Sequence, residues 1–538
     1  MIDVISELET CKLNRREVLI AATTLAVIAA TSSSAISATD AAPVAATKAG
    51  KVRGTVNEGI ACFRGIRYGA TTEGRRFLPP LPASPWQGVR DAFEFAAQSP
   101  QIEGSPSGAS LFTALQANRP PSEDCLFLGV WTPGLRDKKK RPVMVWLHGG
   151  GYVSGSGAVP VYDGRHLSKR GDVVVVTVNH RLGIFGYLYL AGLADTAYAD
   201  SGNIGTLDQI LALKWVKENI TEFGGDPDNV TIFGESGGGG KVSTLLATPA
   251  AKGLFHKAIV QSGSAIVTST AESAATVTTG FLDSLGLKPN QLHELSSMST
   301  ADLTVKAQKS STSGLRLGPV IDGRTLTRQP FDPDAPQVSA NVPMLIGTCK
   351  DELTSISPPA PLLFTLTDAD LRKRVAAMLE PGKLDAILGE LRKIYPYASP
   401  SDFYFTISTW VRMRHRAIVQ AERKLAQRSA PAYMYLLAWE TPVDGGKWKT
   451  PHGLDLPLVF DNVTGSPAML GTGGQAQRVA DAMSSAWVAF ARNGNPGWAA
   501  YDLEKRQTMV FNASSMVVPD PEGAVRQLFV GQPVNRML

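Results

Sequence analysis

Short apolar runs alternate with stretches of helical periodicity through the middle of the chain. The runs are rich in Val and Ile and lie at residues 142–147, 172–178, 229–233 and 258–261. Unbroken apolar runs of this length are typical of strands that are buried on both faces. Between them, residues 207–220 carry apolar side chains at the spacing of one helix face. The alternation predicts an α/β protein with a large, mainly parallel central sheet flanked by helices.

Two regions interrupt this alternation. From about residue 265 to 309, and again from 358 to 397, the pattern is helical and polar, which predicts helical insertions over the sheet. The chain shows no repeat of fixed period and no Pro- or Gly-rich linker long enough to divide it. We therefore expect one large domain that spans residues 39–538.

The segment 1–38 has the order of a cleavable export signal. Arg15 and Arg16 precede an apolar stretch, residues 18–30, and small residues follow. The apolar stretch is shorter than the roughly 20 residues of a membrane-spanning helix, so we expect no stable membrane anchor. The paired arginines are typical of twin-arginine signals, which predicts an exported protein, periplasmic or secreted.

Composition and charge exclude several classes of protein. The 538 residues include 53 Lys+Arg and 48 Asp+Glu, a formal charge of +5, and 43% are hydrophobic, which is typical of a globular chain. The densest basic run is short, residues 138–141, whereas nucleic-acid proteins concentrate their charge in patches. No nucleic-acid partner is expected. The four cysteines have no C-x-x-C spacing, so a zinc ribbon or a thioredoxin-type site is excluded.

The strongest chemical signal is the Gly-x-Ser-x-Gly motif at residues 234–238. It follows the apolar run 229–233 directly and precedes a helical stretch. A serine on such a strand-to-helix turn has a strained backbone and an exposed hydroxyl, and the flanking glycines permit the tight turn. We interpret Ser236 as a nucleophile.

A glycine run after another strand supports this interpretation. Residues 149–151 are three consecutive glycines that follow the apolar run 142–147 and His148. Glycines allow backbone N–H groups to approach a reacting carbonyl without a side chain in the way. The N–H groups of Gly150, Gly151 and Gly237 are therefore candidate donors to the oxyanion of a tetrahedral intermediate.

A serine nucleophile needs a general base and a carboxylate that orients this base. Among the seven histidines, His452 lies after the serine in a loop flanked by Pro and Gly, where a side chain can be presented over a sheet edge. The acid is expected between serine and histidine in sequence. Glu352 follows the apolar run 342–347, at the predicted carboxyl end of a strand. Asp351, the preceding residue, remains an alternative candidate for this acid.

The ordered motifs of the chain resemble the type-B carboxylesterase family, which includes bacterial para-nitrobenzyl esterases and cholinesterases. The resemblance runs from about Val44 to near the C-terminus and includes motifs at residues 122–126, 202–209, 223–237, 319–323 and 486–496. It implies the α/β-hydrolase fold. It also implies Ser236 as nucleophile, His452 as general base and then acid, and Glu352 rather than Asp351 as the orienting acid.

The resemblance assigns further residues and shows where this chain differs. It implies that Gly150, Gly151 and Gly237 are the oxyanion donors and that Glu235 is a buried carboxylate near the site, with a role in substrate binding. Gly237 stands where the family usually has alanine, a change that we expect to loosen the turn. Lys241 stands where the family has a small polar residue. Ser99 replaces the usual disulfide partner of Cys125, so free thiols are expected.

A basic segment suggests a specificity element. In the sequence 410–416, helical spacing places Arg412 and Arg416 on one face and Arg414 apart from them. We hypothesise that Arg412 or Arg416 binds a carboxylate on the acyl group, such as the tricarballylate of fumonisin-type esters. The alternative is a solvated basic helix face.

These observations predict an exported serine carboxylesterase that cleaves small carboxylic esters through an acyl-enzyme, with water as the second nucleophile. No metal and no cofactor are expected, and the protein is expected to be a monomer or a homodimer. The alternative is a catalytically silent ligand-binding or adhesion module on the same fold. An interfacial lipase would need a long apolar lid, whereas residues 99–123 are a short polar loop.

Overall fold

The computed structural model describes residues 42–101, 115, 117, 119–193, 196–288, 291–311, 315–356 and 360–534. These residues belong to the compact unit Pro43–Leu538, apart from Ala42. The predicted export signal, residues 1–38, lies outside the described residues. Within the described ranges, no helix has the length and apolarity needed to cross a membrane.

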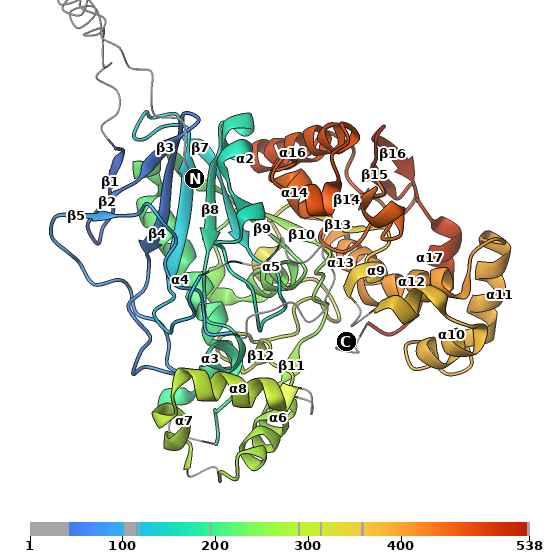
Figure 1. Ribbon diagram of the computed structural model, residues 1–538, viewed down its shortest axis with the longest axis horizontal. Helices are drawn as coiled ribbons and strands as arrows, with labels where there is room; N and C mark the ends of the chain where they lie inside the picture. The colour runs from blue at the N-terminus through green and yellow to red at the C-terminus, as the bar shows by residue number, and fades with distance from the viewer. Residues whose placement is uncertain are drawn as a thin grey trace, which may run out of the picture. The chain divides into compact units, whose positions relative to one another are not determined.

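An eleven-stranded sheet forms the centre of the described part of the chain (Figure 1). In sheet order its strands are β16 Met516–Pro519, β15 Gln507–Phe511, β14 Ala432–Leu437, β13 Met344–Cys349, β10 Lys257–Gln261, β9 Gly225–Glu235, β7 Arg141–Leu147, β8 Val174–Val178, β6 Phe127–Thr132, β4 Ile60–Arg67 and β3 Thr55–Asn57. From β15 to β8 all neighbours pair in parallel, and the strands at both edges pair antiparallel. The predicted mainly parallel central sheet is confirmed.

The unbroken apolar runs are explained by two cores, one on each face of the sheet. Along β7, Val143 and Val145 belong to one core, whereas Met144 and Trp146 belong to the other. Successive side chains of a strand point to opposite faces, so every position of a doubly covered strand is apolar. The first core includes side chains of α4 Ile204–Asn219, α5 Gly237–Ala247 and α13 His415–Ala426, and the second those of α2 Arg165–Gly171, α14 Asp455–Val459 and α16 Gln475–Asn493.

The two predicted insertions are helical. The first contains α6 Ala271–Ser284, α7 His293–Ser297 and α8 Thr300–Ser311, which share a separate apolar cluster with α3 Gly183–Tyr187. The second contains α9 Leu353–Ile356, α10 Asp368–Val375, α11 Leu384–Ile394 and α12 Pro400–Thr409. The remaining elements are strands β1 Val44–Ala46, β2 Lys51–Arg53, β5 Val89–Asp91, β11 Ser269–Thr270 and β12 Val320–Ile321 and helices α15 Pro467–Leu470 and α17 Gly523–Phe529.

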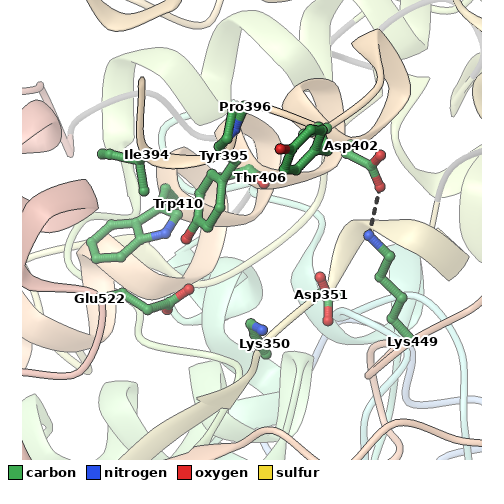
Figure 2. Close-up of a pocket in the computed structure, with 12 residues that line it drawn as sticks. Lys350, Asp351, Ile394, Tyr395, Pro396, Asp402, Thr406, Trp410, Lys449 and Glu522 are labelled. Carbon is green, nitrogen blue, oxygen red and sulfur yellow. Dashed lines mark hydrogen bonds and ion pairs between the residues drawn. The ribbon is translucent and has the colours of Figure 1, made fainter. Parts of the chain in front are cut away.

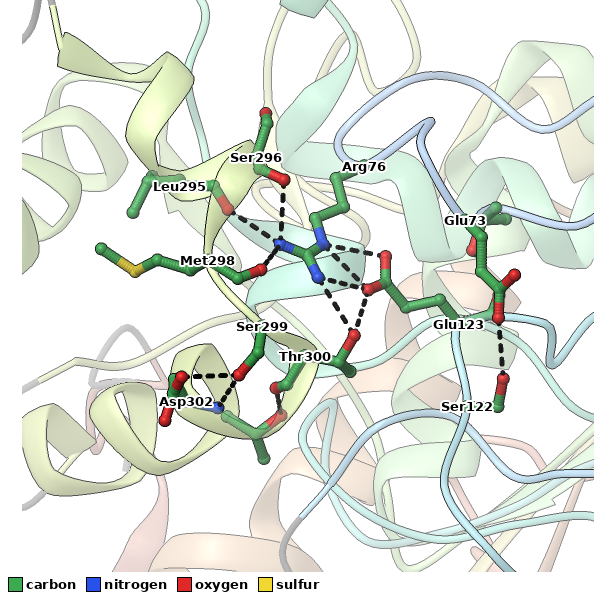
Figure 3. Close-up of polar contacts among 12 residues, drawn as sticks. Glu73, Arg76, Ser122, Glu123, Leu295, Ser296, Met298, Ser299, Thr300 and Asp302 are labelled. Carbon is green, nitrogen blue, oxygen red and sulfur yellow. Dashed lines mark hydrogen bonds and ion pairs between the residues drawn. The ribbon is translucent and has the colours of Figure 1, made fainter.

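One arginine attaches the first insertion to the rest of the unit. Figure 3 shows Arg76 between the carboxylate of Glu123 and the turn that joins α7 to α8. Its Nη2 lies 2.6 Å from Glu123 Oε1, and its Nη1 donates to the carbonyls of Leu295 (2.9 Å) and Met298 (2.6 Å). The hydroxyl of Thr300 donates to the same carboxylate at 2.6 Å. Glu123 is buried, with 5% of its side chain exposed, and only 9% of the Arg76 side chain is exposed, so the charges are compensated only as long as both are present.

Removal of this cation should destabilise the protein strongly. We expect Arg76→Met to lower the free energy of unfolding by about 3–5 kcal/mol, because it leaves Glu123 buried without its partner. The measurement is chemical unfolding followed by circular dichroism. The control is Arg53→Met, which removes the exposed Arg53–Asp91 pair and should leave the free energy of unfolding nearly unchanged. Equal effects of the two substitutions would contradict this interpretation.

Candidate active site

Ser236 lies on a sharp turn between β9 and α5. Its backbone has φ 57° and ψ −124°, a strained conformation for a residue with a side chain. The turn is fixed on both sides, because Ser236 N donates to Gln261 O (2.8 Å) and Gly240 N donates to Ser236 O (3.1 Å). A Cβ at Gly238 would overlap the carbonyl oxygen of Leu147. Glycine is therefore required at position 238 of the motif, because the end of β7 approaches it closely.

His452 and Glu352 form a short hydrogen bond. The Nδ1 of His452 donates to Glu352 Oε2 at 2.5 Å. Glu352 is fully buried, and its other oxygen accepts from the backbone N–H of Cys349 at 2.8 Å. Glu352 follows β13 and His452 precedes α14, so the pair lies at the carboxyl ends of the parallel strands, as Ser236 does. Asp351 is half-buried and does not contact His452.

A second carboxylate lies on the other side of the imidazole. The Nε2 of His452 is 3.1 Å from Glu235 Oε1. Ser236 Oγ makes no hydrogen bond within the described residues, so in this arrangement Nε2 faces Glu235. Burial lowers the pKa of His452, but the charges of Glu235 and Glu352 outweigh this effect and raise it. Burial also raises the pKa of Glu235.

The sequence analysis missed a third buried acid, Asp455. It lies on the first turn of α14, and its Oδ2 accepts from Gln261 Nε2 (2.8 Å) and from the hydroxyl of Tyr435 (3.0 Å). Burial raises the pKa of Asp455 to about 6. Its position three residues after His452 was the only local signal, because both of its partners come from distant strands.

The glycine loop after β7 lies directly against the turn of Ser236. Gly150 and Gly151 have φ of 85° and 62°, which favours glycine. A Cβ at Gly237 would overlap the backbone of Gly151. The expectation that Gly237 loosens the turn is therefore wrong, because the space that an alanine methyl would need is filled by the loop. The three predicted donor residues, Gly150, Gly151 and Gly237, are thus adjacent.

The basic segment lies between α12 and α13, and the Nη1 of Arg414 donates to the carbonyl of Tyr435 in β14 at 3.3 Å. Residues Trp410–Arg414 form a π-helical turn, which changes the helical register that the sequence pattern assumed. Arg416 Nη2 donates to the carbonyl of Val534 at 3.2 Å, in the C-terminal segment. Arg412 and Arg416 are both half-buried, so a fully solvated basic face does not describe them.

A separate cavity of about 400 Å³ lies beside α12 and the π-helical turn (Figure 2). Its lining includes Asp351, Tyr395, Trp410 and Glu522. None of the lining residues is Ser236, Glu352 or His452, although Asp351 directly precedes Glu352. Asp351, the alternative candidate for the orienting acid, faces this cavity (Figure 2).

Three cysteines fall within the described residues, and all are buried and free: Cys62, Cys125 and Cys349. Burial raises the pKa of Cys62 to about 11 and that of Cys125 to about 12. The expectation of free thiols is confirmed for these residues. Thiols that are protonated and buried in this way are poor nucleophiles.

Comparison with known proteins identifies the family of this chain. The model of the carboxylesterase family matches residues 41–518. The para-nitrobenzyl esterase of Bacillus subtilis (strain 168) is 37% identical over 493 residues, which cover 89% of this chain and 96% of the relative. The fumonisin B1 esterase of Sphingopyxis macrogoltabida is 33% identical over 454 residues, which cover 82% of this chain and 80% of the relative.

Solved structures of carboxylesterases also align with this chain over most of its length. A carboxylesterase of Geobacillus stearothermophilus aligns with a TM-score of 0.79 and 38% identity, over 90% of this chain and 99% of that chain. A solved para-nitrobenzyl esterase aligns with a TM-score of 0.78 and 35% identity, also over 90% of this chain and 99% of that chain. The chain has the α/β-hydrolase fold, belongs to the carboxylesterase family and is a carboxylic ester hydrolase.

Proposed function

We propose that the protein is a serine carboxylesterase in which Ser236, His452 and Glu352 act as the catalytic triad. The observation that carries this proposal is the 2.5 Å hydrogen bond between His452 and the fully buried Glu352, at the same sheet edge as the strained Ser236 turn. The bond holds the proton on Nδ1, so Nε2 is available as a base. For the reaction, Ser236 Oγ must form a hydrogen bond with Nε2.

The chemistry has two steps. Ser236 Oγ attacks the ester carbonyl while His452 Nε2 takes the hydroxyl proton, and the resulting oxyanion accepts hydrogen bonds from the N–H groups of Gly150, Gly151 and Gly237. The intermediate collapses, and the alcohol leaves with the proton from His452. Water then attacks the acyl-enzyme by the same route, the carboxylic acid is released, and Ser236 regains its proton.

We propose further that the enzyme is exported. The support is the order of residues 1–38, in which Arg15 and Arg16 precede a short apolar stretch and a small-residue tail. A periplasmic or secreted esterase would meet its small-molecule substrate outside the cytoplasm.

Loss of the nucleophile should abolish ester hydrolysis. We expect Ser236→Ala to lower kcat for a neutral short-chain chromogenic ester by about 10³-fold or more, because the covalent route is lost. The rate of hydrolysis is measured from the absorbance of the released chromophore. The same loss is expected for His452→Ala, and the two losses should not add, since both residues serve one proton transfer.

This experiment also separates the enzyme from a silent binding module. A wild-type protein without activity on neutral and anionic esters would favour the binding module. Full activity of Ser236→Ala would instead show that another nucleophile acts, and the proposed triad would be wrong.

Glu235 should set the pH dependence of the reaction. His452 acts as a base only when it is neutral, so kcat/KM rises as the pH increases through its pKa. Because the charge of Glu235 raises this pKa, Glu235→Gln should move the acidic limb to lower pH by about one unit. The measurement is kcat/KM for a neutral ester against pH. Asp351→Asn is the control and should leave the limb in place; a limb that does not move in Glu235→Gln would contradict the pairing.

The finer proposal concerns the acyl group. One relative is a fumonisin B1 esterase, and Arg412 Nε is buried without a hydrogen-bond partner in the described residues. We propose that the enzyme favours esters that carry a free carboxylate and that Arg412 or Arg416 contributes to this preference by binding that carboxylate.

The test compares two chromogenic esters that differ only in a carboxylate on the acyl group. We expect a higher kcat/KM for the anionic ester, weakened by salt, and a tenfold or larger loss for it in Arg412→Ala or Arg416→Ala. The neutral ester serves as the internal control. Equal losses for both esters would show that the arginines act on folding alone.

A further inference from the structure

A lysine amine is buried directly behind the glycine loop. Lys241 lies on α5, five residues after Ser236, and its side chain is only 1% exposed. Its Nζ donates a hydrogen bond to the carbonyl oxygen of His148 at 2.7 Å. The ring of Tyr152, in the glycine loop, lies 5.9 Å from the same nitrogen. The amine thus connects the helix of the nucleophile to the loop of the predicted oxyanion donors.

No carboxylate compensates this amine within the described residues. Besides Tyr152, its titratable neighbours are the imidazoles of His148 and His180, which stack at 4.9 Å. Each ring pairs its Nδ1 with a backbone carbonyl, that of Gly149 or that of Arg181, and burial lowers the pKa of both histidines. Both rings are therefore neutral.

Such a burial is costly for the fold. Burial lowers the pKa of Lys241 to about 7, and an uncompensated amine in the interior destabilises a protein. Local conflicts of this kind are expected mainly at functional sites. A role close to the site would explain why a lysine occupies this position.

The hydrogen bond fixes the start of the glycine loop. The carbonyl of His148 belongs to the peptide unit that continues into Gly149, the first of the three loop glycines. Side chains of the loop hold two of the glycine carbonyls, because His148 Nδ1 bonds to Gly149 O (2.9 Å) and Ser154 Oγ donates to Gly150 O (3.2 Å). The far end of the loop is held separately, because Gly150 O accepts from Val153 N (3.3 Å) and Ser154 N (3.1 Å). Without Lys241, the near end would lose its polar contact with α5.

We propose that Lys241 is a positioning residue, which holds the oxyanion loop at a fixed place relative to Ser236 through the carbonyl of His148. The amine does not touch the ester. This inference rests on the proposed function, because it assigns the loop glycines to the oxyanion. It also gives a role to the position where the family has a small polar residue.

The chain offers a matched control for the test. Lys424, on α13, is also 1% exposed, and its Nζ donates to the carbonyls of Ser339 (3.0 Å) and Ala340 (2.6 Å). Burial lowers its pKa to about 8. Lys241→Met and Lys424→Met therefore remove the same kind of buried amine, one at the loop and one among carbonyls outside the proposed site.

We expect both substitutions to lower the thermal unfolding midpoint but only Lys241→Met to impair the chemical step. Its kcat for a neutral ester should fall tenfold or more, with KM changed by less than about threefold, because the loop acts on the transition state. A trifluoromethyl ketone reacts reversibly with the serine hydroxyl to form a hemiketal oxyanion, which resembles the tetrahedral intermediate. This inhibitor should bind more weakly by the same factor as the loss in kcat/KM. Lys424→Met should change neither quantity.

Three results would overturn the inference. Unchanged kcat in Lys241→Met, a loss confined to KM, or equal losses in the two lysine variants would each assign Lys241 to stability alone while the proposed function stands. Full activity of Ser236→Ala would overturn the proposed function and this inference with it. If Lys241→Met does not fold, Lys241→Leu also removes the amine, and a kcat equal to that of the wild type in that variant would again overturn the proposal.

Discussion

The strained backbone at Ser236 is the constraint on which the surrounding elements depend. A positive φ at a residue with a side chain persists only when neighbouring structure holds it, and here β10 and α5 do so through hydrogen bonds to both sides of the residue. The sharp turn brings the start of α5 so close to the end of β7 that Gly238 has no room for a side chain. The order of the parallel strands, the glycines and the direction of α5 are therefore parts of one arrangement.

Electrostatics around His452 forms the second layer of the site. Glu235, Glu352 and Asp455 are buried near one imidazole, and the pKa of Glu235 and that of Asp455 are raised by burial. Such a cluster is stable only when protons are shared among its members. Glu352 is distinguished by its direct bond to Nδ1 and by its backbone donor, whereas Asp455 is held by neutral partners. These different surroundings give Glu352 the orienting role and leave Glu235 and Asp455 as neighbouring acids.

Local patterns predicted much of the fold and part of the site. The doubly covered strands produce unbroken apolar runs, and the turn of Ser236 and the glycine loop have motifs within a few residues, so both could be recognised. The choice between Glu352 and Asp351 could not be made from spacing, because adjacent residues of a turn point in different directions. Asp455 was missed because its partners, Gln261 and Tyr435, are brought to it only by the sheet. The π-helical turn at Trp410–Arg414 could not be predicted, because it is not visible in an α-helical pattern.

The contact between Gly237 and Gly151 has an evolutionary consequence. The loop occupies the volume that a methyl group at residue 237 would need, so residue 237 and the path of the loop cannot change independently. A lineage that moves from one arrangement to the other must pass through an overlap or an unfilled gap at the most constrained point of the enzyme. We therefore expect substitutions at these positions to be epistatic, with alanine at residue 237 tolerated only together with a changed path of the loop.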